Sequence, residues 1–337
     1  MLSHHLPQLT RRRFAAASVL LAGAPAFAQI AAPAGATAAW PNRPLRLLVG
    51  YSAGGGVDAM ARLLALRLAE PLGQQVVVEN RAGATSVIAA DAVAKAAPDG
   101  YTLMLADSAL LVSKILNPRQ PLDPLTAFAP VAGAFHSPLM IVAGNQFPAN
   151  NPRELVQLLK ASPGKYSYAT SGIGTVQHLG FEMFKNAVGA FVVHIPYRGA
   201  AQIVPDVISG QVPLGVVSAT AGMAQAKAGR LKAIALMSPG KPPGMETIAA
   251  LADAVPGFNA VPYLFLLAPA GTPADVVSRL SEAVKLVLEA PATTQAAAAQ
   301  GGVRSYLPAA QLGPHMARES AAWQQVIREQ KISADNG

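Results

Sequence analysis

A glycine-rich stretch stands at Gly50-Tyr51-Ser52-Ala53-Gly54-Gly55-Gly56-Val57-Asp58. It follows the apolar run Leu45–Val49, which is typical of a short strand. It precedes a segment, 57–71, in which apolar residues recur at helical spacing. Glycine lets a backbone approach a ligand closely, and the free N–H groups of a first helical turn attract anions. The stretch therefore predicts an anion-binding turn between a strand and a helix.

A second loop of this kind follows a strand expected at 166–170. It reads Thr170-Ser171-Gly172-Ile173-Gly174-Thr175, with Thr175 as the N-cap of a following helix. Hydroxyl and backbone N–H groups suit a carboxylate or a phosphate. Neither loop carries a P-loop lysine or the glycine spacing of a dinucleotide fingerprint. Each loop alone could be a tight strand–helix turn, but together they favour two helix starts facing each other across a cleft.

The organisation of the chain is that of an α/β protein. Of its 337 residues, 52% are hydrophobic and 13% are charged, so a large core is available. From Trp40, short apolar strands alternate with helices, which predicts parallel sheets with helices on both faces. The segments 273–288 and 309–330 read as two long helices. Strands are expected at 45–49, 76–79, 102–106, 139–143, 166–170, 192–195, 214–217, 233–237 and 264–268.

The N-terminal segment, 1–28, has the three parts of an export signal. Thr10–Phe14 is positively charged, Ala15–Ala24 is a short apolar stretch, and Ala26-Phe27-Ala28 is a small-x-small cleavage site. We therefore expect export to the periplasm with cleavage after Ala28. The twin-arginine and general secretion routes both remain open. The segment 29–39 is rich in Ala, Pro and Gly and reads as a flexible linker.

The charge pattern and the lack of cysteine exclude several classes of function. The formal charge of +8 includes Arg11, Arg12 and Arg13, and the other Lys and Arg residues are scattered singly. This pattern does not form a nucleic-acid-binding stripe. A chain with 0 Cys has no disulfide, no thiolate metal site and no cysteine nucleophile. We expect no cofactor and no metal site.

A series of further motifs runs along the chain in a fixed order. Trp40-Pro41-Asn42-Arg43-Pro44 starts the series, and Val76–Ala84, Ala94–Leu103, His194–Gly199 and Ala268–Pro273 follow the first loop. Together with the two loops, this set resembles the periplasmic solute-binding proteins of tripartite tricarboxylate transporters, the Bug family. The resemblance covers nearly all of the chain from Trp40.

The resemblance implies a two-lobed periplasmic binding protein of a type II-like fold. Each lobe would be a mainly parallel sheet flanked by helices, with two crossings of the chain between the lobes. Lobe 1 would comprise 40–138 and 263–337, and lobe 2 would comprise 139–262. Such a protein, expected to be a monomer, captures a small carboxylate in the cleft and passes it to membrane permease subunits. An orphan receptor that signals through a sensor kinase is the alternative.

The ligand-binding residues implied by the two loops and by the resemblance come from both lobes. Individual roles stay open. Asp58 either binds ligand or compensates the helix dipole, and His178 either faces the cleft or is packed. Arg198 either binds a carboxylate or lies on the surface. The candidates are Tyr51, Ser52, Ala53, Gly54, Gly55, Gly56, Asp58, Thr85, Ser86, Asp107, Ser108, Thr170, Ser171, Gly172, Gly174, Thr175, His178, Tyr197, Arg198 and Ser218.

The chain departs from the family pattern at the expected pocket wall. Tyr51-Ser52-Ala53 replaces prolines before the glycines, and Thr85-Ser86 replaces glycines. Val217-Ser218 stands where an Asp-Asn pair is common, so the wall is more apolar and favours an aromatic or aliphatic acid. Asp107 replaces a small hydroxyl residue. It would bind a ligand ammonium or hydroxyl, or cap a helix over 109–116.

An enzyme, such as a secreted α/β hydrolase, is the competing class of function. The chain has no Gly-x-Ser-x-Gly elbow and no His-Glu-x-x-His motif. Ser171 and His178 are seven residues apart along one turn and helix, which is poor geometry for a nucleophile–base pair, and no orienting acid is evident. We therefore expect a binding protein rather than an enzyme.

Overall fold

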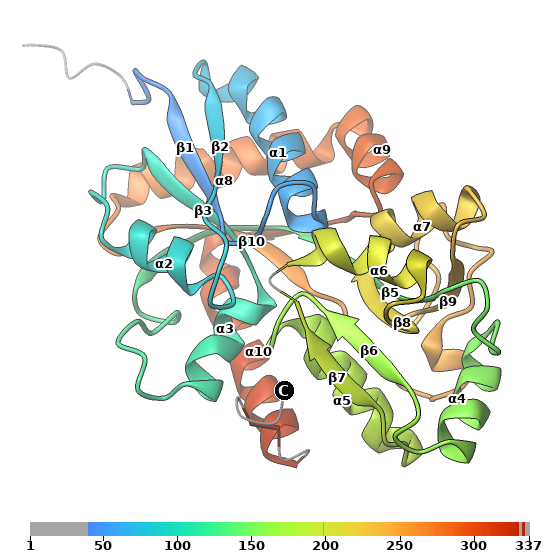
Figure 1. Ribbon diagram of the computed structural model, residues 1–337. Coiled ribbons are helices and arrows are strands. Elements are labelled where there is room, and N and C mark those ends of the chain that lie inside the picture. The colour runs from blue at the N-terminus through green and yellow to red at the C-terminus, as the bar shows by residue number, and fades with distance from the viewer. Residues whose placement is uncertain (1–39, 198, 330–331, 334–337) are drawn as a thin grey trace, which may run out of the picture. The chain divides into compact units, whose positions relative to one another are not determined.

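The strands form two separate sheets, each flanked by helices (Figure 1). The computed structural model describes residues 40–197, 199–329 and 332–333. The expected export signal, the linker and Arg198 lie outside the described residues. No helix in the described ranges is both long enough and apolar enough to cross a membrane. The α/β fold class predicted from the sequence is confirmed.

The larger sheet has six strands in the order β11-β4-β10-β3-β1-β2. Strands β1, β2, β3 and β4 run in one direction, and β10 and β11 run in the other. The majority direction agrees with a mainly parallel sheet. The strands are β1 (Leu45–Val49), β2 (Val76–Asn80), β3 (Thr102–Asp107), β4 (Phe128–His136), β10 (Tyr263–Pro269) and β11 (Val303–Pro308).

The smaller sheet has five strands in the order β7-β6-β8-β5-β9. Strand β5 alone runs against the other four. The two sheets therefore share one plan, in which most of the parallel strands lead into a helix. The strands are β5 (Leu139–Ala143), β6 (Ser167–Thr170), β7 (Val193–Pro196), β8 (Leu214–Ser218) and β9 (Lys232–Leu236).

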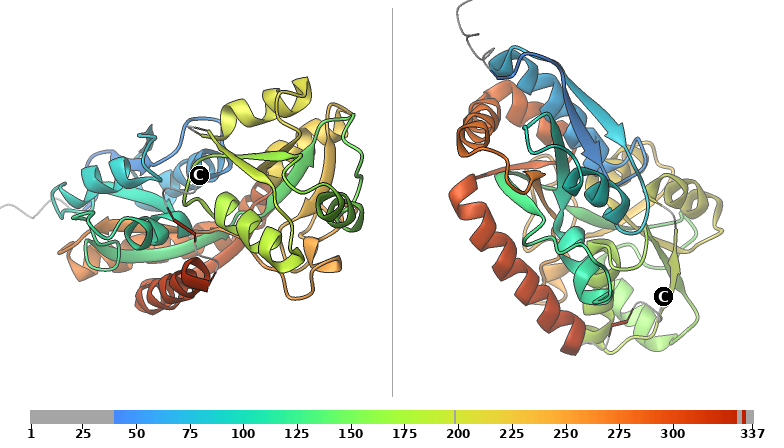
Figure 2. Two further views of the ribbon diagram at one scale, coloured as in Figure 1. Left: turned by 60° about the horizontal axis from the view of Figure 1, so that its bottom comes forward. Right: turned by 90° about the vertical axis from the view of Figure 1, so that its left-hand side faces the viewer.

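The helices cover both faces of each sheet, as Figure 2 shows from two further directions. Helices α1 (Gly56–Leu72), α2 (Val87–Ala94), α3 (Ser108–Leu116), α8 (Ala274–Glu289) and α9 (Pro291–Ala299) belong with the six-stranded sheet. The five-stranded sheet carries α4 (Pro152–Ala161), α5 (Val176–Val188), α6 (Ile203–Ser209) and α7 (Ala219–Lys227). The last helix is α10 (Ala309–Glu329), and two short 3-10 turns lie at Ala200–Gln202 and Leu251–Asp253.

The crossings explain why β5 and β10 are antiparallel to their neighbours. Only Ser137 and Pro138 separate the end of β4 from the start of β5. So short a connection must start β5 at the sheet edge where the parallel strands end, and Leu139 indeed pairs with Ser218, the last residue of β8. The returning strand β10 does the same beside β3. The Ser137 N–H donates to the Pro262 carbonyl (2.9 Å), which joins the two crossings.

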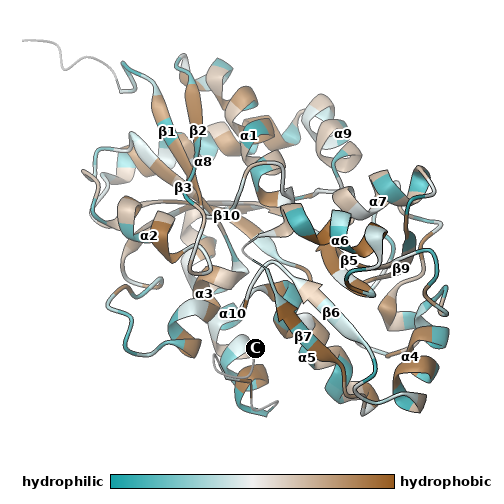
Figure 3. Ribbon diagram, viewed as in Figure 1, coloured by the Kyte–Doolittle hydropathy of each residue, from teal (hydrophilic) through white to brown (hydrophobic). Residues whose placement is uncertain are grey.

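Alternation of side chains along the strands builds a core on each face of each sheet. Along β1, Leu47 and Val49 pack under α1 and α8, whereas Leu48 faces the opposite side with α2, α3 and α10. The five-stranded sheet divides in the same way. Figure 3 shows apolar residues, coloured brown, along strands of both sheets. Trp323 and Ile327, late in α10, join the core of the five-stranded sheet, so the last helix binds elements of both sheets together.

Two strands were not predicted from the sequence. β4 contains Pro130 and Gly133, which are unfavourable inside strands. The structure accommodates both because β4 has irregular register with β10 and β11. Gly133 is required here, since a Cβ atom would lie 1.7 Å from the Tyr263 hydroxyl oxygen. β11 lies between the two long helices predicted from the sequence, in a segment for which no strand was predicted.

Phe265→Ala tests the core of the six-stranded sheet. Phe265 is fully buried on β10, and its truncation should lower the free energy of unfolding by about 3–5 kcal/mol in denaturant titrations. The control is Phe191→Ala, because Phe191 is 61% exposed and should cost less than about 1 kcal/mol. Equal losses in the two variants would contradict the described core.

Candidate functional site

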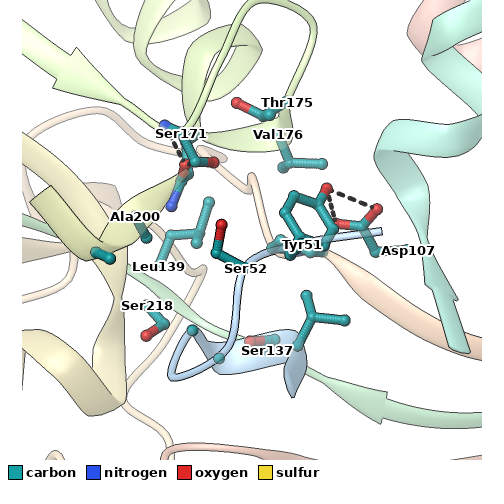
Figure 4. A pocket seen from close by; sticks show the side chains of 16 residues that line it. Tyr51, Ser52, Asp107, Ser137, Leu139, Ser171, Thr175, Val176, Ala200 and Ser218 are labelled. Atoms are coloured by element: carbon teal, nitrogen blue, oxygen red, sulfur yellow. Dashed lines mark hydrogen bonds between the residues drawn. The ribbon is translucent and has the colours of Figure 1, made fainter. Parts of the chain in front are cut away.

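A cavity of about 60 Å³ lies where the carboxyl ends of strands from both sheets meet (Figure 4). The loop after β1 contributes Tyr51 and Ser52, and the loop after β6 contributes Ser171. The crossings contribute Ser137 and Pro262. The cavity therefore has walls from segments that are far apart in the chain, as expected for a ligand site in α/β sheets.

Four helices begin at this cavity. The N-cap residues of α1, α3, α5 and α7 are Gly55, Asp107, Thr175 and Ser218, and all four line it. Helices α1 and α3 follow strands of the six-stranded sheet, whereas α5 and α7 follow strands of the five-stranded sheet. The first N–H groups of a helix have no partner within the helix, and its N-terminus carries a partial positive charge. The four N-termini therefore bring positive partial charge to the cavity, and none of the described residues that line it is basic.

Gly56 shows how closely the two halves of the site approach. A Cβ atom at this position would lie 2.8 Å from the Cβ of Ser218 and 3.4 Å from the Ser137 hydroxyl oxygen. Any larger residue would push the start of α1 away from the start of α7. The sequence predicted only that the backbone at the glycine run approaches a ligand closely. The structure shows that Gly56 is also needed for the close approach of α1 to α7.

Asp58 holds the first loop and does not line the cavity. Its carboxylate accepts hydrogen bonds from the Gly54 N–H (2.9 Å), the Asn80 side-chain amide (2.8 Å) and the Arg62 guanidinium (3.0 Å). Burial raises the pKa of Asp58, but the hydrogen bonds from Arg62, Gly54 and Asn80 outweigh burial, so its pKa lies below the usual value. The hydrogen bonds of Asp58 therefore hold the loop and the start of α1, and its side chain does not face the cavity.

His178 is packed behind the second loop rather than facing the cavity. Its ring stacks on His194 at 4.2 Å between centroids, and its Nδ1 accepts from the Gly174 N–H (3.2 Å). Thr170 lies in the same layer, with its hydroxyl oxygen 2.7 Å from His194 Nε2. Burial lowers the pKa of His178 to about 4 and that of His194 to about 3, so both rings are neutral near pH 7.

Ser171 and His178 do not form a nucleophile–base pair. The Ser171 hydroxyl and N–H both donate to the Gln177 side-chain oxygen. The Nδ1 atom of His178 instead accepts a hydrogen bond from the Gly174 N–H. Gln177 thereby braces the second loop and lines the cavity itself.

Asp107 and Tyr51 form a buried pair at the edge of the cavity. The Tyr51 hydroxyl donates to both carboxylate oxygens of Asp107 (2.9 and 3.0 Å), as Figure 4 shows. Asp107 is 5% exposed. Burial raises the pKa of Asp107 to about 7, although the hydrogen bond from Tyr51 acts in the opposite direction. Asp107 occupies the N-cap position of α3, but its carboxylate faces Tyr51 and makes no capping hydrogen bond to the helix.

A larger hollow of about 680 Å³ adjoins the cavity and shares Tyr51, Ser52, Ser171 and Thr175 with it. Of the expected residues, Thr85, Gly172 and Tyr197 line this hollow. The Thr85 hydroxyl donates to the Ile173 carbonyl (2.9 Å), which joins the loop before α2 to the loop before α5. The Tyr197 hydroxyl donates to Asp206 (2.6 Å).

Several expected site residues therefore stand apart from both spaces. Gly54 and Gly174 form turns at positive φ, and Ser86 packs against Gly50. The Ser108 hydroxyl oxygen accepts from the Tyr263 N–H (2.9 Å). The expected residues that line neither space are Ala53, Gly54, Asp58, Ser86, Ser108, Thr170, Gly174 and His178.

Sequence reasoning also missed part of the cavity wall. Val57 and Val176, just inside α1 and α5, follow the N-caps and could have been found from the helix starts. Leu139 and the crossing residues Ser137 and Pro262 had a weaker signal, namely that a crossing must pass the cleft. The missed cavity residues are Val57, Ser137, Leu139, Val176, Gln177, Ala200, Ala201 and Pro262.

Asp107→Asn should change how stability depends on pH. The pKa of Asp107 is about 7 in the folded protein and about 4 in the unfolded chain. Between about pH 4 and pH 7, the folded protein therefore holds a proton on Asp107 that the unfolded chain has released. Its contribution to stability is therefore present at about pH 4 and falls as pH rises to about 7. The free energy of unfolding of the variant, relative to wild type, should rise across this interval by up to roughly 4 kcal/mol.

Denaturant titrations at several pH values measure this difference. Asp275→Asn, at an exposed position of α8, is the control and should show little change with pH. A difference between Asp107→Asn and wild type that stays constant with pH would contradict the raised pKa.

Comparison with known proteins identifies the family. Residues 60–332 match the family described as "Tripartite tricarboxylate transporter family receptor". The chain is 35% identical to the protein BugT of Bordetella pertussis over 307 residues, which cover 90% of this chain and 94% of BugT.

Solved structures agree with this match. The R. palustris protein Rpa4515, solved with adipate, is 29% identical with a TM-score of 0.84, over 87% of this chain and 99% of that one. MatC from Rhodopseudomonas palustris, with bound malate, is 25% identical with a TM-score of 0.78, over 86% and 100%. The resemblance drawn from the ordered motifs is thus confirmed, and the chain belongs to the Bug family of tripartite tricarboxylate transporter receptors.

Proposed function

We propose that the protein binds a small carboxylate in the cavity between its two sheets and delivers it to membrane permease subunits. The observation that carries the proposal is the set of four helix N-termini, from both sheets, that line one cavity. Membership of a receptor family supports the transport role.

Backbone groups are the expected ligands of the carboxylate. Each helix N-terminus stabilises a nearby anion by about 0.3–1 kcal/mol when exposed, and by up to about 2 kcal/mol in partly buried geometry. Ser52 and Ser137 line the cavity, and their hydroxyls make no hydrogen bond to another described residue. They are therefore available to donate to a ligand oxygen.

Binding between two sheets also gives a mechanism for signalling occupancy to a permease. A ligand that touches α1 and α5 at once favours the arrangement in which the two sheets are close. The Thr85–Ile173 hydrogen bond would add to that closed arrangement. In this proposal the moving lobes are 40–138 with 263–337, and 139–262.

The relatives support the class of ligand. Adipate, bound by Rpa4515, and malate, bound by MatC, are both dicarboxylates of small size. In this chain the larger hollow beside the cavity would accommodate the remainder of such a ligand.

The protein is proposed to act in the periplasm and without chemistry. The export signal predicted over 1–28, with cleavage after Ala28, supports the location. The separate hydrogen bonds of Ser171 and His178 support a receptor over a hydrolase.

Ser52→Asp tests the anion site directly. Ser52 lines both spaces, so a fixed carboxylate there should repel an anionic ligand and lower its affinity at least about tenfold. Thermal shift and calorimetry with succinate, glutarate, adipate, malate, aspartate and glutamate provide the measurement. Wild type should gain about 2.7 kcal/mol of stability at a ligand concentration of 100 times Kd.

Ser278→Asp is the matched control, because Ser278 is exposed on α8 and outside the lining residues. It should bind as wild type does. Full affinity in Ser52→Asp would contradict the proposed site, and turnover of the bound compound would contradict the receptor role.

A further inference from the structure

We propose that the cavity selects carboxylates that also carry a cationic amino group, and that Asp107, with the Tyr51 hydroxyl, receives this group. The inference rests on the proposed function and names the ligand class of the same site. It follows from the hydrogen-bonding character and the charge of one corner of the cavity.

The side chains of Asp107, in its ionised form, and Tyr51 present acceptors at this corner. The single proton of the Tyr51 hydroxyl is directed at the two Asp107 carboxylate oxygens (3.0 and 2.9 Å). The remaining lone pairs belong to the Tyr51 oxygen and to the carboxylate. A ligand carboxylate would be repelled by this corner, whereas an ammonium group offers three donors and a compensating charge.

Asp107 has no cationic partner in the described part of the chain. Among the described residues that line the cavity it is the only charged one, and none of the ion pairs formed by described residues includes it. A buried carboxylate without a cation is costly, and a neutral hydroxyl does not balance its charge. The raised pKa of Asp107, caused first by burial, reflects the same deficit.

Asp58 provides the internal comparison. It is as buried as Asp107, at 2% against 5% exposed, and like Asp107 it lies at the start of a helix that begins at the cavity. Asp58, however, has the Arg62 guanidinium, the Asn80 amide and a backbone N–H as donors. Where a carboxylate holds the loop, the fold thus supplies its donors. Holding Tyr51 alone would need only a neutral acceptor, so the charge of Asp107 points to a cation that arrives with the ligand.

The rest of the site fits the other end of such a ligand. The N-termini of α1 and α5 would hold the carboxylate, and Asp107 would hold the amino group of the same molecule. One buried water occupies about 10–15 Å³ of cavity volume. The cavity of about 60 Å³ therefore has room for the few atoms that join the carboxylate to the amino group. The remainder of the ligand would extend into the adjoining hollow.

Calorimetry with matched ligand pairs tests the inference. The pairs are succinate with aspartate, glutarate with glutamate, and 3-phenylpropionate with phenylalanine, whose members differ only in the amino group. In the best-bound pair, wild type should bind the amino member at least about tenfold more tightly. Asp107→Asn should reduce this ratio to within about threefold, whereas Asp275→Asn should leave it unchanged.

The outcomes separate the inference from the proposed function. Equal or tighter binding of the unsubstituted acid by wild type would overturn the inference and leave carboxylate binding intact. A preference that persists in Asp107→Asn would overturn the role of Asp107. No binding in any pair would overturn the proposed function and, with it, this inference. Should Asp107→Asn not fold, the wild-type ratio still decides the ligand class. Tyr51→Phe then tests the corner: it should lower the preference, because one acceptor is lost, without abolishing it, because the Asp107 carboxylate remains.

Discussion

The meeting of four helix N-termini at one cavity is the constraint on which the rest of the structure depends. Each of these helices is the next element after a strand, so it begins near the carboxyl edge of its sheet. The two-residue crossing from β4 to β5 turns the carboxyl edges of both sheets towards each other. Gly56 then allows the start of α1 to lie against Ser218. Among the described residues that line the cavity, positive partial charge comes from the backbone at the helix starts, and the side chains define which ligands fit.

Acidic groups near this cavity are divided between two roles. Asp58 turns away from it and holds the loop through three hydrogen bonds. Asp107 turns towards it, and among the described residues its one side-chain donor is the Tyr51 hydroxyl. His178, which is buried, and His194, which is half-buried, are neutral at ordinary pH, because burial lowers their pKa. Electropositive helix ends and one acidic corner therefore give the site both signs of charge.

Local sequence signals predicted the frame of this site but not its full wall. A glycine run after an apolar strand is a local pattern, and it correctly located the starts of α1 and α5. The burial of His178 depends on stacking against His194, a contact that no pattern in either segment contains. Ser137 and Pro262 meet because Tyr263 pairs with His136 across the sheet, and such pairing is set by the whole fold. Strand β4 escaped prediction because its proline and glycine are tolerated only in that irregular register.

A crystal structure with a carboxylate that stabilises the protein would test the central claim most directly. The account predicts that carboxylate oxygens lie about 2.7–3.2 Å from backbone nitrogens in the first turns of both α1 and α5. A carboxylate held by a basic side chain, or bound in the outer hollow without contact to either helix start, would contradict it.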